Sequence, residues 1–453
     1  MRYLWCCMDE KSKLRTTIGL TIGVFLAAME GTVVATAMPN VIMDLGGEHL
    51  YSLPFSMYLL TMTVSSPLWG KFSDIFGRRR IYAIGVLIFL IGSAGCGFSQ
   101  SMEFLITMRI IQGIGAGSMS PLTFTINADM YSIEKRAKMQ GYMSGVWGFS
   151  GLVGPLLGGF IVDWLDWRYI FYLNIPFGIF ALFMVYFNYR DSIERTTFRL
   201  NWPGVILFTL GAGSLVIGLE NMNYIWIAAG CIGMAVSWML DSRHPNPLLP
   251  VGSLKLKIPR TAIIQNVLAG MGYFGILAFL PLYVQRVEDR GATTAGLVLT
   301  PMIVGWTITS IIGGRLLPRV GLLTLTRMGF SLLVLGFLSF FIFYDNTILF
   351  LSMAGLTVGA GMGFSMLGTL LLTQEYSPKN ELGSSTSSIM FGRTIGGSIG
   401  VSILSAIISD HLTSSLPILQ SAFRSAYLAC LIFAVLAFCI SFTIHPPSPK
   451  SQT

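Results

Sequence analysis

Charged residues are scarce in this sequence. Asp, Glu, Lys and Arg make up only 11% of its 453 residues, against about 25% in an average soluble protein. Apolar residues make up 53% of the chain, which is more than the cores of one or two soluble domains absorb. These proportions exclude a soluble enzyme, a nucleic-acid-binding domain and a disordered scaffold, and they favour a protein that is embedded in a membrane.

Residues that carry catalytic and metal chemistry are also few. The four histidines and six cysteines do not have the spacing of zinc ligands. Lys71 is the one lysine preceded by glycine, and the upstream glycine and following Ser or Thr of a phosphate-binding loop are missing there. We therefore expect no metal site, no cofactor and no enzyme activity in this chain.

Long apolar runs fill most of the sequence. A helix needs about 20 apolar residues to cross the hydrocarbon layer of a bilayer, and fourteen runs of this kind are present, joined by short connections. The sequence therefore predicts an all-α polytopic membrane protein without an inserted soluble domain. The predicted spans are 17–38, 51–69, 81–99, 103–128, 139–161, 169–189, 202–219, 223–240, 261–284, 295–313, 325–344, 347–373, 387–409 and 425–444.

The basic residues indicate the orientation of these spans. With the N-terminus inside, the outer loops hold only Arg168, Arg286, Arg290 and Arg424, and nearly all other Lys and Arg fall in the inner loops and the two tails. Cytoplasmic loops of membrane proteins collect Lys and Arg. Both termini are therefore predicted to be cytoplasmic, and the net charge of +8 needs no nucleic-acid partner to explain it.

A glycine and basic pattern occurs twice. Gly70–Gly77 follows the second span and Gly314–Gly321 follows the tenth, and both read Gly, basic residue, five residues, Gly. The positions favour two six-helix halves with two helices between them, a 6+2+6 arrangement. The predicted parts are a cytoplasmic tail over 1–16, a six-helix bundle over 17–200, two additional helices over 201–258, a second six-helix bundle over 259–444 and a cytoplasmic tail over 445–453.

Two ionisable residues lie well inside the first half. Glu30 lies in the first span, ~12 Å from its outer end, and Arg109 lies in the fourth span, ~9 Å from its outer end, at 1.5 Å per residue. An ionisable residue inside a span is a functional-site hypothesis because burying it unpaired is costly. The alternative is a purely structural ion pair.

The first inner loop joins glycines to charged residues. Gly70 and Gly77 permit turn geometry and close helix approach, and Asp74 can cap a helix or pair with a neighbouring arginine. A basic loop that only sets the topology would explain the arginines, but it would not explain Asp74 or the glycine spacing.

Glycines also recur along the fifth span. Residues three or four positions apart share one helix face, so small residues there let a second helix approach closely, and proline loosens the helix. Ordinary helix packing is the alternative. The residues that we single out are Gly141, Gly154, Pro155, Gly158 and Gly159.

These motifs give the chain a resemblance to the major facilitator superfamily, and within it to the fourteen-helix drug:proton antiporter branch of the EmrB/QacA type. Gly70–Arg80 is similar to the first inner-loop signature, Leu105–Gly117 to the fourth-helix signature and Gly141–Gly159 to the antiporter signature. Glu30–Pro39 is similar to the first-helix signature of the branch, with Glu30 where Asp is usual. Ser150 stands where the antiporter signature expects glycine.

The resemblance implies the major facilitator fold and export of lipophilic, often cationic compounds by alternating access, driven by inward proton flow. It implies a functional monomer in the cell membrane with protons as the coupling ion. Glu30 and Arg109 would couple the proton, and Asp74 would brace the inner gate against Arg136 and the start of the thirteenth span. The implied gating residues are Gly70, Asp74, Gly77, Arg78 and Arg136.

Aromatic and polar residues in the spans are candidates for substrate contact, since aromatic faces attract lipophilic cations. Most such residues in a span serve packing alone. A dedicated metabolite, lipid or sugar transporter of the same superfamily, working as a symporter or facilitator, stays open as an alternative. The candidate residues are Tyr58, Gln112, Trp147, Tyr273 and Phe274.

The predicted topology can be tested with single cysteines. Fourteen spans place Ser414 outside and Lys450 inside the cell. In a cysteine-free background, Ser414→Cys should react with an impermeant thiol reagent added to intact cells, and Lys450→Cys should react only after permeabilisation. Labelling of Lys450→Cys in intact cells would contradict the span count.

Overall fold

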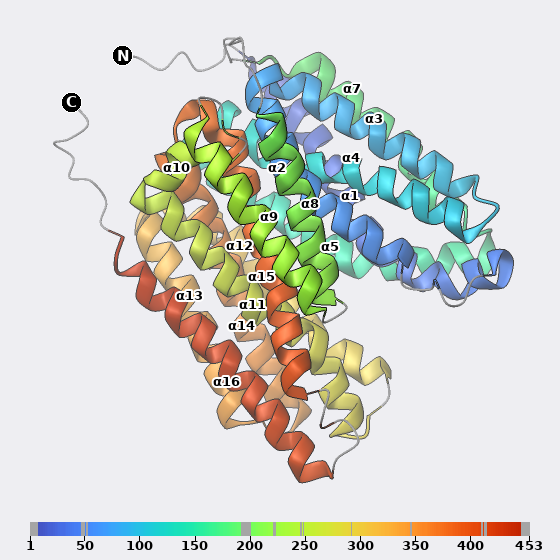
Figure 1. Ribbon diagram of the computed structural model, residues 1–453, viewed down its shortest axis with the longest axis vertical. Helices are drawn as coiled ribbons and strands as arrows, with labels where there is room; N and C mark the ends of the chain where they lie inside the picture. The colour runs from blue at the N-terminus through green and yellow to red at the C-terminus, as the bar shows by residue number, and fades with distance from the viewer. Residues whose placement is uncertain are drawn as a thin grey trace. The chain divides into compact units, whose positions relative to one another are not determined.

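The structure is a computed structural model, shown in Figure 1. In the part of the chain that it describes, all regular secondary structure is helical. Ser414, Lys450 and the predicted tail over 445–453 lie outside that part. The described residues are 8–46, 50, 53–191, 201–220, 223–244, 247, 249–290, 292–344, 347–408, 411 and 415–444.

Each of the fourteen predicted spans falls on one long helix, or on the pair α6–α7 in the case of the sixth. The helices are α1 (Glu10–Leu45), α2 (Leu53–Phe76), α3 (Arg78–Gly97), α4 (Met102–Met130), α5 (Ile133–Trp164), α6 (Tyr169–Tyr172), α7 (Asn174–Asn188), α8 (Trp202–Glu220), α9 (Tyr224–Arg243), α10 (Val251–Lys255), α11 (Lys257–Arg286), α12 (Ala292–Val320), α13 (Leu322–Ile342), α14 (Ile348–Tyr376), the 3₁₀ turn η2 (Lys379–Glu381), α15 (Leu382–Ile408) and α16 (Leu416–Ser441).

The described residues contain 10 helices that are long and apolar enough to cross a membrane. They confirm an all-helical membrane protein. The count of fourteen spans and their 6+2+6 order remain predictions.

The first helix begins and ends with local signals that the sequence carries. Asp9 is the N-cap of α1, and its carboxylate accepts a hydrogen bond of 3.3 Å from the backbone N–H of Ser12. That hydrogen bond lowers the pKa of the Asp9 carboxyl. Gly46 ends the helix at φ 70°, a left-handed value that glycine adopts without a steric cost.

The chain forms two compact units. The first comprises 1–251 and 378–391, and the second comprises 252–377 and 392–453. In the first unit, α2 and α3 pack on α4, α1 packs on α5 and α7, and α8 packs on α9 (Figure 1). In the second unit, α12 and α13 pack on α14, while α11 and α13 pack on α16. The α2–α4 and α12–α14 pairs hold corresponding places in the two predicted halves.

Glycine brings the helices of these pairs to backbone contact. A Cβ added to Gly113 of α4 would lie 2.5 Å from the carbonyl oxygen of Tyr58 in α2. A Cβ added to Gly363 of α14 would lie 2.6 Å from the carbonyl oxygen of Trp306 in α12. The two units therefore use the same packing device, and it gives Tyr58 and Trp306 equivalent positions.

The α3–α4 contact allows a test of this packing. A Cβ on Gly92 of α3 would lie 2.6 Å from the Cα of Gln112 in α4, so Gly92→Ala forces two backbones apart. We expect Gly92→Ala to lower the free energy of unfolding by about 1–3 kcal/mol, measured as a fall in Tm in detergent. Gly213→Ala is the control, because nothing lies within 4 Å of its Cβ position. Equal Tm values for the two variants would refute the close contact.

Candidate functional site

A fully buried ion pair joins the first and fourth helices of the first unit. Nη1 of Arg109 lies 2.5 Å from Oε2 of Glu30, and both side chains are 0% exposed. The pair forms because α1 packs against α4 and both residues lie at similar depth in their helices. The structure thus brings together the two residues that the sequence analysis proposed for proton coupling.

Arg109 has further partners from α2 and from its own helix. Its Nε donates to the carbonyl oxygen of Pro54 at 3.0 Å, and its Nη1 donates to Oε1 of Gln112 at 2.7 Å. The guanidinium carbon lies 4.2 Å from the centre of the Tyr58 ring, within the range of a cation–π contact. The Tyr58 hydroxyl donates to the carbonyl oxygen of Ala27 at 3.1 Å. These contacts fix the guanidinium from several sides.

Glu30 also binds Asn174 of α7, which in turn binds Ser93 of α3. Asn174 donates its Nδ2 to Oε1 of Glu30 and, at 2.9 Å, to Oγ of Ser93. Nε2 of Gln112 also donates to Oγ of Ser93, at 3.2 Å. Side chains from five helices, α1, α2, α3, α4 and α7, therefore form one buried polar cluster. A buried ion pair is tolerated only when such hydrogen bonds satisfy it.

The sequence analysis missed Asn174 and Ser93. Both are 0% exposed and both lie in otherwise apolar runs, where a polar side chain must find a partner. That signal was available in the sequence. The partner was not, because the contact between Asn174 and Glu30 spans 144 residues.

Some hydrogen-bonding capacity in the cluster is unused. Within the described ranges, Nη2 of Arg109 and Oδ1 of Asn174 have no hydrogen-bond partner. An amide carries both donors and an acceptor. Asn174 can therefore donate to an ionised Glu30 or, after rotation of its amide, accept from a protonated one. The cluster is equipped for both charge states of the carboxyl.

A second charged cluster lies where α2, α3 and α4 end or begin. Arg78 forms ion pairs with Asp129 and, at 3.7 Å, with Asp74. The Asp74 carboxylate also accepts from the backbone N–H groups of Gly383 at 2.9 Å and Ser384 at 2.8 Å. Asp74 thus binds the first turn of α15, where unpaired N–H groups and the helix dipole favour an anion.

The inner loop predicted over 70–80 is helical except at Gly77, since α2 continues to Phe76 and α3 begins at Arg78. Gly70 therefore makes no turn. Cβ atoms on Gly70 and on Gly383 would each lie 2.6 Å from the other residue's carbonyl oxygen, so α2 and α15 meet there backbone to backbone. Gly77 precedes α3 with φ 92°, which glycine allows. Arg136 of α5, the predicted partner of Asp74, donates its Nη2 to the carbonyl oxygen of Ala128 at 2.8 Å.

The predicted antiporter segment lies on α5, which is continuous from Ile133 to Trp164. Gly141, Gly154 and Gly158 are buried. The surroundings of Pro155 and Gly159 are outside the described side chains, so the part of this prediction that concerns them has no structural account.

The substrate candidates divide into three groups. Tyr58 and Gln112 belong to the buried Glu30–Arg109 cluster. Trp147 is half-buried on α5. Tyr273 and Phe274 lie on α11 of the second unit, with ring centres 5.4 Å apart. Their role as substrate contacts remains a prediction.

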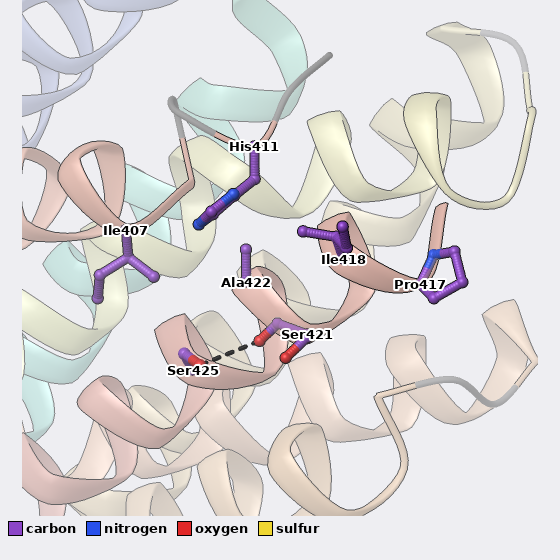
Figure 2. A pocket seen from close by; sticks show the side chains of 7 residues that line it. All are labelled: Ile407, His411, Pro417, Ile418, Ser421, Ala422 and Ser425. Carbon is purple, nitrogen blue, oxygen red and sulfur yellow. Dashed lines mark hydrogen bonds between the residues drawn. The ribbon is translucent and has the colours of Figure 1, made fainter. Parts of the chain in front are cut away.

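A hollow of about 420 Å³ lies at the end of α15 and the start of α16. Figure 2 shows apolar side chains, one imidazole and two serines around it, and Oγ of Ser425 donates to the carbonyl oxygen of Ser421. It contains none of the predicted site residues. Its lining is Ile407, His411, Pro417, Ile418, Ser421, Ala422 and Ser425.

Comparison with known proteins defines the class. Residues 20–401 match the family model described as Major Facilitator Superfamily. Because this match covers most of the sequence, the chain belongs to that superfamily. It is a multi-pass membrane transporter and not an enzyme.

The chain is similar to curated multidrug proteins of bacteria. It is 34% identical over 417 residues to the multidrug transporter protein MdtP of Bacillus subtilis, covering 88% of this chain and 76% of the relative. It is 32% identical to multidrug resistance protein 3 of the same organism, covering 88% and 80%. It is 27% identical to the multidrug efflux pump SdrM of Staphylococcus aureus, covering 86% and 88%.

Solved structures support the fold alone. The human organic anion transporter MFSD10 superposes with a TM-score of 0.69 at 13% identity, covering 94% of this chain and 100% of that one. The proton:xylose symporter XylE superposes with a TM-score of 0.67 at 16% identity, covering 97% of each chain.

The coupling within the buried cluster can be measured. Arg109→Met leaves the Glu30 carboxylate without its counter-charge and should reduce the free energy of unfolding by about 3–5 kcal/mol. Adding Glu30→Gln should restore part of this loss, because the unpaired charge is then gone. Thermal unfolding of the two single variants and the double variant in detergent gives the interaction energy. Additive losses would show that the pair is not coupled.

Proposed function

We propose that this protein is a proton-coupled multidrug exporter of the fourteen-helix antiporter branch, working as a monomer in the cell membrane with both termini cytoplasmic. Its substrates would be lipophilic, often cationic compounds. The multidrug names of its relatives support drug export. The observation that carries proton coupling is the buried Glu30–Arg109 pair inside the first unit. Burying ionisable residues costs free energy, and within membrane spans such residues commonly mark proton or ion pathways.

In this proposal Glu30 carries the coupling proton. Protonation removes the charge of the carboxylate and releases Arg109 from its counter-ion. Gln112 and Pro54 still accept from the guanidinium, and Asn174 can turn its oxygen towards the new O–H group. The cluster would then exchange hydrogen bonds and stay intact. A transporter requires this if Glu30 is protonated in one conformation and ionised in the other.

The available driving force is of the right size. A proton that enters down a potential of ~100 mV and a gradient of about one pH unit releases roughly 3.7 kcal/mol. This free energy corresponds to a substrate gradient of several hundred-fold. That gradient applies to a neutral substrate. Exchange of one proton for a monovalent cation moves no net charge, so the pH gradient alone, about 1.4 kcal/mol or tenfold, would drive its export.

The cluster around Asp74 would act as the inner gate. Its contacts join α2 and α3 to the first turn of α15 through two charge-assisted hydrogen bonds and the ion pair with Arg78. Charge-assisted hydrogen bonds are strong but short, so they would be lost when the helices separate. The gate would be closed while the Asp74 contacts are made and open when α15 moves away.

Proton coupling is tested by Glu30→Gln, which keeps the length of the side chain, replaces one acceptor oxygen by an NH2 group and cannot carry the proton. In a pump-deficient host, ethidium efflux and resistance should fall to background, and drug-induced proton release from proteoliposomes should be lost. Glu30→Asp should retain part of the activity. Glu103→Gln, at the exposed start of α4, is the control and should transport normally. Unimpaired proton release in Glu30→Gln would end the assignment.

The gate is tested by Asp74→Asn. The substitution removes the charge that Arg78 pairs with and turns an N–H group towards one of the donors in α15. We expect transport to fall at least about tenfold, at the cost of two charge-assisted hydrogen bonds, with unchanged expression. Asp166→Asn, in an exposed pair with Arg168, should have no effect. Normal transport by Asp74→Asn would leave this carboxylate without a gating role.

A further inference from the structure

The second unit contains a buried cation of its own. Arg393 of α15 is only 8% exposed, and its Nη1 donates to Sδ of Met366, a weak acceptor. Among the described residues no carboxylate lies within 4 Å of Arg393, and its Nε has no hydrogen-bond partner. A buried guanidinium without a counter-charge is expensive, so this arrangement needs an explanation.

The ring of Trp306 lies beside Arg393, and its indole N–H is a second hydrogen-bond donor without an acceptor among the described residues. The guanidinium carbon of Arg393 lies 5.9 Å from the centre of the Trp306 ring. The indole N–H of Trp306 is buried and has no acceptor in the described part of the chain. The ring of Tyr273 lies 5.1 Å from Trp306, nearly perpendicular to it. Two N–H donors without acceptors therefore lie beside aromatic faces.

The buried arginines of the two units differ in their partners. Arg109 lies over Tyr58 much as Arg393 lies beside Trp306, and these two rings hold equivalent places in their units. Arg109 has the carboxylate of Glu30 at 2.5 Å. In the second unit the ring is repeated, but the cation comes from α15 and not from α14, the counterpart of α4. Among the described residues, no carboxylate there lies within ion-pair distance of it.

We propose that Arg393, Trp306 and Tyr273 form a binding site for the carboxylate of an aromatic organic acid. The guanidinium and the indole N–H would donate to the carboxylate oxygens, while the ligand's ring would pack on Tyr273 and on the adaptable side chain of Met366. The donor atoms are themselves buried, so the acid would reach them only when the partly buried rings of Trp306 and Phe274 move aside. The proposal rests on the proposed function in taking the bound acid to be a transported substrate.

The experiment compares three probes of equal shape and different charge. The full-length protein in nanodiscs is titrated with radiolabelled 2-naphthoate, with neutral 2-naphthylmethanol and with cationic 2-naphthylmethylammonium as competitors. The wild type should bind 2-naphthoate at least about tenfold more tightly than the alcohol, the ratio expected from one charge-assisted hydrogen bond. Equal affinities for the acid and the alcohol would overturn the proposal without any variant.

Three variants divide the contributions of the site. Arg393→Gln should weaken 2-naphthoate at least about tenfold and leave the alcohol nearly unchanged. Arg393→Lys should retain an intermediate affinity because it keeps the charge without the planar fork. Trp306→Phe removes the indole donor and also makes the ring smaller. The lost packing affects both probes, so the lost donor should show as a larger weakening of the acid than of the alcohol. Unchanged 2-naphthoate binding in both Arg393→Gln and Trp306→Phe would show that the buried cation serves packing alone.

Arg424→Gln is the matched control. Arg424 of α16 also lies beside aromatic rings, 4.9 Å from the centre of Phe341 and 5.2 Å from that of Tyr344, but it is exposed. Its substitution should leave binding of all three probes unchanged. If Arg393→Gln does not fold, Arg393→Lys and the charge preference of the wild type still decide the outcome.

The result is separable from the test of proton-coupled export. Ethidium efflux that depends on Glu30, together with no preference for 2-naphthoate, would refute this site and keep the proposed function. A preference for 2-naphthoate that depends on Arg393, without ethidium efflux, would refute cation export and keep this site.

Discussion

The burial of two opposite charges is the constraint on which the first unit depends. Glu30 and Arg109 are both fully removed from solvent, so each needs the other as counter-charge, together with hydrogen bonds to most of the remaining polar atoms. Among the described residues, Nη2 of Arg109 is left without a partner. This requirement fixes the depth and rotation of α1 and α4 relative to each other. It also explains why α2, α3 and α7 each contribute a polar group at the same level. The geometry of the polar cluster and the packing of the helices therefore depend on each other.

Close helix packing brings the polar side chains of the cluster within hydrogen-bond distance of one another. A side chain larger than hydrogen at Gly92 or Gly113 would separate the helices that carry the cluster, and hydrogen bonds of about 2.7–3.2 Å are lost when such a shift takes the partners beyond about 3.5 Å. The second unit uses the same device at Gly363. Backbone-to-backbone contacts of this kind are rigid within a unit. In the proposed function, the helices that would separate are α2 and α15, which meet around Asp74.

The two units treat buried arginine differently. Arg109 has a carboxylate from its own chain, which suits a group that exchanges a proton. Arg393 has a sulfur and aromatic rings in the described residues, which suits a cation that receives its counter-charge from a ligand. With this division, the first unit would bind the proton and the second unit would bind the substrate. Substitutions that alter substrate binding could then leave the proton site unchanged.

The sequence by itself determined the class of this protein. Fourteen apolar runs predicted where the long helices lie, because crossing a bilayer imposes a length and a composition that can be counted. Glu30 and Arg109 were found because ionisable residues in apolar runs are rare. Only the tertiary structure decided what surrounds them. Asn174 and Ser93 entered the cluster, and Tyr58 and Gln112 proved to lie in it, because contacts between helices far apart in sequence depend on rotation and depth, which the hydrophobic pattern does not encode.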